Sequence, residues 1–127
     1  MVIALIIAGF IIVGALMFAG VAMNAPESRY VEGNNVHMEG ETQVIEIDAK
    51  GGYLPRKSVA KAGIPTIIRF NTSGTFDCSA SVRIPSLNVS QVLSQSGSTD
   101  IAIGTQGAGP LQGSCGMGMY PFEVIFE

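Results

Sequence analysis

Sulfur side chains are concentrated in one short stretch near the C-terminal end of the chain. Cys115, Met117 and Met119 alternate there with Gly116 and Gly118. Side chains of an extended backbone alternate between faces, so this spacing predicts that the three sulfurs lie on one face. The glycines allow tight bends and keep bulk away from the sulfurs. Thiolates and thioethers are soft ligands that select Cu(I) over hard cations, so the stretch predicts a copper site.

The second cysteine of the chain, Cys78, follows the turn-forming residues Gly74 and Thr75. We expect Cys78 to fold back onto the Cys115 stretch and complete an all-sulfur copper site. The residues alone leave two alternatives open, in which the cysteines form a disulfide or are buried as small apolar side chains. Methionines can also fill a core, but glycine spacers leave voids there, and voids cost stability.

Charge divides the chain into two unlike parts. The sequence has 127 residues and a formal net charge of −3, which suits one domain and gives nucleic acid no basic surface to bind. All seven Lys and Arg and all ten Asp and Glu follow Pro26. The residues before Pro26 therefore differ in kind from the rest, because they carry no charged side chain.

The uncharged run Val2–Met23 predicts a membrane anchor, because about 20 apolar residues span a bilayer as a helix. The alternative is a cleaved signal peptide, with Gly20–Ala22 as a cleavage site, but the run is long and no basic residue precedes it. Cytoplasmic flanks carry the excess of Lys and Arg, and here Arg29 follows the run. We therefore expect a single-pass protein of the cell membrane with its soluble domain in the cytoplasm.

Polar and turn-forming residues follow the anchor and predict a flexible tether, so the expected organisation is anchor 1–24, tether 25–43 and folded domain 44–127. The only histidine, His37, lies in the tether, where we expect a solvated side chain or, as an alternative, an accessory ligand.

Short β-forming segments separated by turn residues fill the expected domain. They predict strands at 44–49, 58–61, 66–71, 79–84, 99–103 and 122–127, an ambiguous segment at 89–93, and a glycine-rich loop at 104–113. No helical period of useful length interrupts them. This pattern predicts an antiparallel sandwich or small barrel, whose loops carry the site.

The domain resembles a known family in two places. The runs Gly51–Pro55 and Val59–Pro65, with the strand after them, resemble the opening of bacterial cupredoxin-like domains. A cysteine before a strand, followed by the Cys-Gly-Met-Gly-Met-Tyr loop at 115–120 and a last strand, resembles the sulfur-only branch of that family. With the anchor added, the chain resembles the streptococcal CupA-type membrane-anchored Cu(I) chaperones over residues 44–127.

The resemblance implies an all-β, cupredoxin-like antiparallel sandwich preceded by one transmembrane helix. It also implies that the sulfur set binds one or two Cu(I) ions and passes copper to the metal-binding domain of a copper-exporting P-type ATPase. The matching positions are Cys78, Cys115, Met117 and Met119.

The donor set departs from that of blue-copper electron carriers, which use two His, one Cys and an axial Met. Cys78 takes the place expected for the first His, and the C-terminal loop has no His. Without imidazoles the site disfavours Cu(II), so cycling between oxidation states is not expected.

Three classes of function remain. We expect a protein that buffers and transfers copper in copper homeostasis, not an enzyme, because the sequence shows no nucleophile–base pair or phosphate-binding loop. Under this copper-transfer hypothesis, Cys78 and Cys115 bind the tighter ion as thiolates. Met117 and Met119 serve a second ion or the transfer route. The alternatives are a redox protein and a structural domain with a Cys78–Cys115 disulfide.

Overall fold

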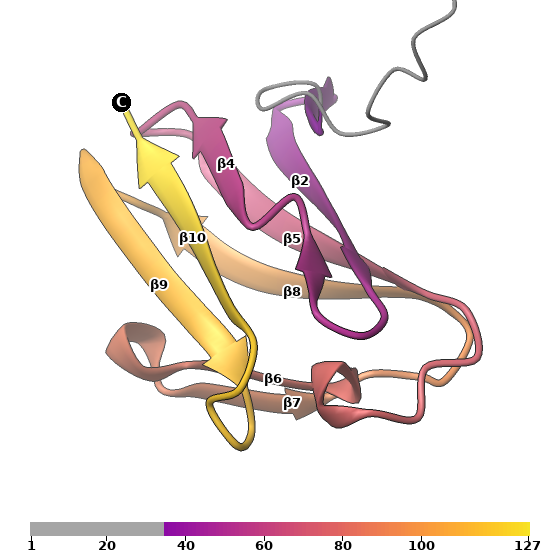
Figure 1. The fold of residues 1–127 in the computed structure, drawn as a ribbon. Helices are drawn as coiled ribbons and strands as arrows, with labels where there is room; N and C mark the ends of the chain where they lie inside the picture. The colour runs from indigo at the N-terminus through magenta and orange to yellow at the C-terminus, as the bar shows by residue number, and fades with distance from the viewer. Residues whose placement is uncertain (1–34) are drawn as a thin grey trace, which may run out of the picture.

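The computed structural model describes residues 35–127, which form a sandwich of two five-stranded sheets (Figure 1). The first sheet contains β1 (Val36–Glu39), β2 (Thr42–Ala49), β3 (Tyr53–Leu54), β5 (Pro65–Thr72) and β8 (Gly97–Thr105). The second contains β4 (Lys57–Ala60), β6 (Ser81–Ile84), β7 (Val89–Val92), β9 (Gly109–Cys115) and β10 (Pro121–Phe126). Two short 3₁₀ helices, η1 (Cys78–Ala80) and η2 (Pro85–Leu87), flank β6. The predicted anchor and residues 25–34 of the predicted tether lie outside the described residues.

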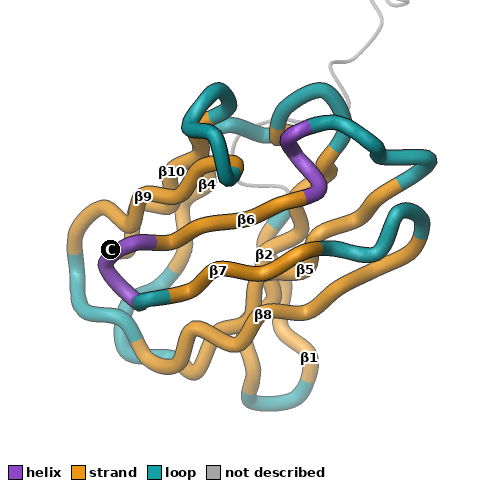
Figure 2. Tube along the Cα trace, turned by 90° about the horizontal axis from the view of Figure 1, so that it is seen from below, coloured by secondary structure: helices purple, strands orange, loops and turns teal. Residues whose placement is uncertain are grey.

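The strands follow the alternation of apolar and polar residues. In β10, Phe122, Val124 and Phe126 are buried while the residues between them are half-buried, which confirms the predicted face. β5 alternates in the same way, because each of its even-numbered residues from Thr66 to Thr72 points into the sandwich. The segment that was ambiguous in the sequence forms β7, which runs beside β6 (Figure 2).

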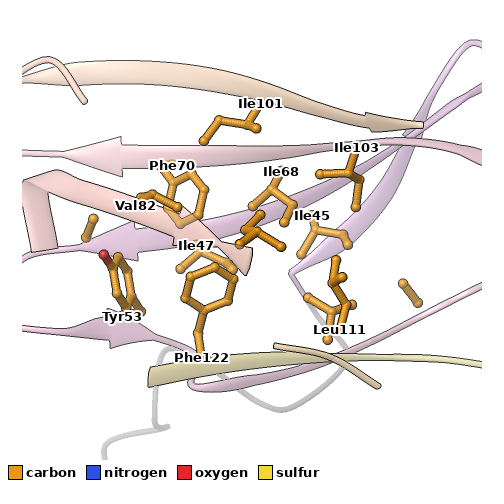
Figure 3. Close-up of a cluster of buried hydrophobic side chains, with 14 of the residues drawn as sticks. Ile45, Ile47, Tyr53, Ile68, Phe70, Val82, Ile101, Ile103, Leu111 and Phe122 are labelled. Atoms are coloured by element: carbon orange, nitrogen blue, oxygen red, sulfur yellow. The ribbon is translucent and has the colours of Figure 1, made fainter. Parts of the chain in front are cut away.

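The core lies between the sheets. Ile45, Ile68 and Phe70 of the first sheet pack toward Leu111 and Phe122 of the second (Figure 3). The buried apolar side chains form one continuous cluster that reaches Cys115. Burial of this surface supplies the main driving force for folding and does not require a metal ion.

Three aromatic rings fill the core near its cysteine end. Tyr53, Phe70 and Phe122 meet edge to face, and the Tyr53 and Phe122 centroids lie 5.0 Å apart. The Phe122 ring lies on Gly113, where any Cβ atom would clash with it. Gly113 therefore allows β9 to pass close to the aromatic cluster two residues before Cys115.

The prediction of a purely antiparallel sandwich is wrong, because both sheets are mixed. β2 pairs with β5 in parallel, and β10 pairs with β4 in parallel, while the other pairs are antiparallel. Parallel neighbours need a crossover connection of about a dozen residues or more. The chain between β2 and β5 meets this requirement by passing through β3 and β4, which belong to different sheets.

Two boundaries also differ from the prediction. β1 lies inside the expected tether 25–43 and pairs with β2, so the folded domain begins before residue 44. The expected loop at 104–113 is mostly strand, because β8 continues to Thr105 and β9 begins at Gly109. Glycine is a poor strand former, but the ladder to β10 holds these residues extended. Across residues 35–127, no helix has the length and hydrophobicity needed to cross a membrane.

Candidate copper site

The two cysteines lie together, as predicted, and are joined by a disulfide. Their Cα atoms are 5.6 Å apart although they are separated by 37 positions in the sequence. No cysteine within residues 35–127 is free. The structure therefore brings two of the four predicted sulfurs to one point, in the oxidised state.

The meeting of the cysteines follows from strand pairing. η1 begins with Cys78 and leads directly into β6 (Figure 2). β6 then pairs with the end of β9, where Val82 is the register partner of Cys115. The backbone ladder between β6 and β9 thus places Cys115 beside the strand that follows Cys78, independently of the sulfur chemistry.

A carboxylate shapes the turn that carries Cys78. Asp77 is the N-cap of η1, and its Oδ1 accepts a hydrogen bond from the Ser79 backbone N–H at 2.8 Å and another from the Ser79 hydroxyl. Its Oδ2 accepts a hydrogen bond from the Gly51 backbone N–H at 2.7 Å. The bond from the Ser79 hydroxyl, together with these backbone bonds, lowers the pKa of Asp77. Asp77 is therefore held as a carboxylate that bridges two loops.

The residues after Cys115 form a tight turn instead of an extended segment. The Cys115 backbone N–H donates to the Tyr120 carbonyl at 3.0 Å, and the Gly118 N–H donates to the Cys115 carbonyl at 2.9 Å. Gly118 has a φ of +74°, a left-handed conformation that glycine adopts readily. The predicted extended backbone is therefore wrong, because the chain reverses direction between β9 and β10.

The four predicted ligands differ sharply in exposure. Cys115 is completely buried and Cys78 is half-buried. Met117 and Met119 are 80% and 61% exposed. The structure therefore places the thioethers in solvent, on the turn that follows Cys115, where they are open to an approaching molecule. Phe76, two residues before Cys78, is 76% exposed and adds a further apolar side chain to this end of the sandwich.

His37 lies far from the cysteines along the first sheet. It belongs to β1 and pairs with Val44 near the start of β2, whereas the site adjoins the loop after the end of β2. Its Nε2 is 3.8 Å from a carboxylate oxygen of Glu39. The alternative role of His37 as an accessory ligand has no support in this arrangement. The part of the chain that the structure describes holds no cluster of three or more His, Cys, Asp and Glu suited to a metal ion.

The β2–β3 loop is a part of the site that the sequence reasoning missed. In this loop, residues 50–52, Gly51 bonds to Asp77, and a Cβ atom on Gly52 would lie 3.7 Å from the Tyr120 ring. The Tyr53 hydroxyl donates to the Ser81 carbonyl at 3.0 Å. Burial and, to a smaller extent, the nearby Asp77 charge raise the pKa of Tyr53. The hydroxyl therefore keeps its proton and remains a donor.

Both the sequence and the structure of the chain resemble those of known proteins. The sequence profile of the cupredoxin-like domain family matches residues 10–125. An apo copper binding protein solved by NMR is similar in structure, with a TM-score of 0.68 and 26% identity over 75% of this chain and 97% of that one.

A second solved structure has the same fold. It is the metal binding domain of the Streptococcus pneumoniae D39 Cu(I) exporting P-type ATPase CopA with Cu(I). Its TM-score is 0.65, with 24% identity over 72% of this chain and 92% of that one. A search of curated proteins gave no match.

Proposed function

The chain belongs to the cupredoxin-like domain family, and we propose that it is a CupA-type, membrane-anchored Cu(I) chaperone. In this proposal it buffers copper and passes it to the metal-binding domain of a copper-exporting P-type ATPase. Copper is its cargo, so the protein binds and transfers an ion and does not catalyse a reaction. Similarity to the apo copper binding protein supports the copper-binding part of the proposal.

One observation carries the proposal: two cysteine sulfurs meet at the end of the sandwich beside two exposed methionines. After reduction of the disulfide, the same backbone positions present two thiolates to one ion. Thiolates and thioethers match the preference of Cu(I), and the site lacks the imidazoles that a blue-copper centre uses. Cys78 and Cys115 are therefore assigned to the tighter ion.

The difference in exposure supports different roles for the cysteine and methionine sulfurs. Cys115 is buried against the core, whereas Met117 and Met119 extend into solvent. Cu(I) with two or three sulfur ligands can accept an incoming thiolate before it loses an outgoing ligand. The neutral, exposed thioethers are placed to meet the incoming partner first, and they are assigned to transfer or to a second ion.

Membrane attachment completes the proposal. The apolar run Val2–Met23 is assigned as a retained anchor, with the folded domain in the cytoplasm. Tethering the chaperone in the same membrane as the ATPase raises the local concentration of each for the other.

Copper titration of the full-length protein tests the proposal. Protein purified in detergent and kept reduced without oxygen is titrated with Cu(I) and examined by native mass spectrometry. We expect the mass of one or two copper ions and no colour, because d¹⁰ Cu(I) has no ligand-field band. Intense absorption at about 600 nm after oxidation would indicate a blue-copper site and support electron transfer instead.

The disulfide favours a second candidate function, a structural or interaction domain that the Cys78–Cys115 bond stabilises. Such bonds persist in oxidising compartments and are rare in the cytosol. Acid quenching of intact cells followed by thiol alkylation separates the two functions. Two alkylated cysteines support the chaperone, and a protein that is oxidised throughout growth supports the structural domain.

A further inference from the structure

We propose that Asp77 is a positioning residue that holds Cys78 at the correct distance from Cys115 before copper arrives. Its role is exerted through the β2–β3 loop, residues 50–52, which bonds to the Cys78 turn and lies beside the Cys115 turn. The inference deepens the proposed function and rests on it where copper is concerned. The positioning itself is a property of the metal-free protein and can be measured without copper.

The Cys78 turn is held by several specific contacts, and Asp77, the residue before Cys78, makes three of them. Thr75 and Ser79 are buried, whereas Ser73, Gly74, Phe76 and Asp77 are exposed. Hydrogen bonds add to burial there. The Thr75 hydroxyl donates to the Ala49 carbonyl at 2.6 Å, and the Gly51 N–H donates to Asp77 at 2.7 Å.

The same loop lies beside the Cys115 turn. A Cβ atom on Gly52 would be 3.7 Å from the Tyr120 ring, and the Tyr120 carbonyl closes the turn that carries Met117 and Met119 by accepting the Cys115 N–H. Asp77 thus ties the Cys78 turn to a loop that lies beside the Cys115 turn.

A third contact joins the Cys78 turn and the Cys115 turn directly. The Ser81 carbonyl accepts one hydrogen bond from the Tyr53 hydroxyl and another from the Gly116 N–H at 3.2 Å. These two bonds hold Tyr53, Ser81 and Gly116 together. The Asp77–Gly51 bond then connects the Cys78 turn to this group. Ligands held in advance lose less entropy on binding, so the removal of this link weakens any reaction that needs both sulfurs together.

Two substitutions remove the link to different extents. Asp77→Asn keeps an oxygen that can accept from Ser79, but its amide group donates and cannot accept from the Gly51 N–H as well. Asp77→Ala removes all three bonds. Asp100→Asn is the matched control, because it removes one exposed carboxylate that bonds to Arg69 on the outer face of the first sheet.

The experiment has two arms on full-length protein in detergent. In the first, each variant competes with a chromogenic chelator for Cu(I). In the second, the metal-free protein is equilibrated with reduced and oxidised glutathione. Two protein thiols then give two electrons and two protons to one glutathione disulfide, yielding the Cys78–Cys115 disulfide and two glutathione thiols. The second arm converts neutral thiols into a neutral disulfide, so it reports proximity with little influence from the Asp77 charge.

We expect Asp77→Ala to weaken both equilibria by about tenfold, from the loss of an N-cap and a charge-assisted bond. We expect a smaller loss in Asp77→Asn and no change in Asp100→Asn. Copper binding by the parent with unchanged values in both Asp77 variants would overturn the inference. If the parent does not bind copper, the proposed function fails, and the glutathione arm alone decides the inference: a shift supports it and no shift overturns it. Should Asp77→Ala not fold, Asp77→Asn gives the same decision.

Discussion

Ser81 and Gly116 approach each other so closely that a methyl group at position 116 would displace the Ser81 hydroxyl. The Gly116 N–H bonds to the Ser81 carbonyl, and a Cβ atom on Gly116 would lie 2.8 Å from the Ser81 hydroxyl oxygen. This contact lies between the two cysteine turns. The glycine after Cys115 thus allows a tight approach to Ser81, in addition to any role in giving the sulfurs space.

Gly116→Ala is expected to destabilise the domain by about 1 kcal/mol, the lower end of overpacking costs, because the new methyl group must displace the Ser81 hydroxyl. Ser81→Ala removes the hydroxyl and should restore most of the loss in the double variant. Urea denaturation measures both values. Gly107→Ala is the control, since nothing lies within 4 Å of its Cβ position. A double variant as unstable as the single one would contradict this explanation.

The four sulfurs are expected to be unequal in copper binding. Cys78→Ser and Cys115→Ser each replace a soft anionic ligand with a hard neutral one and should weaken tight Cu(I) binding by at least about a hundredfold. Met117→Ala and Met119→Ala should spare the tight ion and lose the second ion or slow transfer. Chelator competition distinguishes the two effects.

Met38→Ala is the control for the methionine variants, because Met38 is 50% exposed on β1, away from the cysteines. Equal losses in cysteine and methionine variants would indicate one shared site. Cysteine variants that keep the parent affinity would show that copper binds elsewhere.

The reduced, metal-free protein is expected to stay folded. A disulfide between residues 37 positions apart stabilises by about 4 kcal/mol through the entropy of the unfolded chain. The apolar cluster between the sheets does not depend on the sulfurs, so part of the stability should remain after reduction. Circular dichroism with and without reductant measures this. A β spectrum that returns only with copper would contradict it.

The folded domain is expected to face the cytoplasm. Ser90→Cys places a thiol on exposed β7, and replacing both native cysteines with serine makes it the only target. A membrane-impermeant maleimide should label this variant only after the cells are permeabilised. Rapid labelling of intact cells would reverse the topology.

Local patterns in the sequence predicted the strands well and their partners poorly. Apolar and polar residues alternate along β10 and β5, and this local pattern is enough to predict a strand. The parallel pairing of β2 with β5 depends on a crossover through both sheets, which no local pattern encodes. β9 escaped prediction because its glycines disfavour a strand, although Gly113 is required there by the Phe122 ring.

The candidate site shows the same division. The closeness of Cys78 and Cys115 was predicted from soft-ligand chemistry and the expected fold, and it is confirmed. The shared face of Met117 and Met119 was derived from an extended backbone that the turn does not have. The Asp-Cys-Ser run at 77–79 carries the signal of an N-cap, but its second partner, Gly51, lies 26 positions away.

The register of β6 on β9 also has a calorimetric consequence. Because backbone pairing and the closed core place Cys115 before any metal binds, copper uptake buries little new apolar surface. Heat capacity changes on binding follow the apolar area removed from water. Copper binding to the reduced protein should therefore have a heat that hardly varies with temperature, in contrast to domains that fold around their metal.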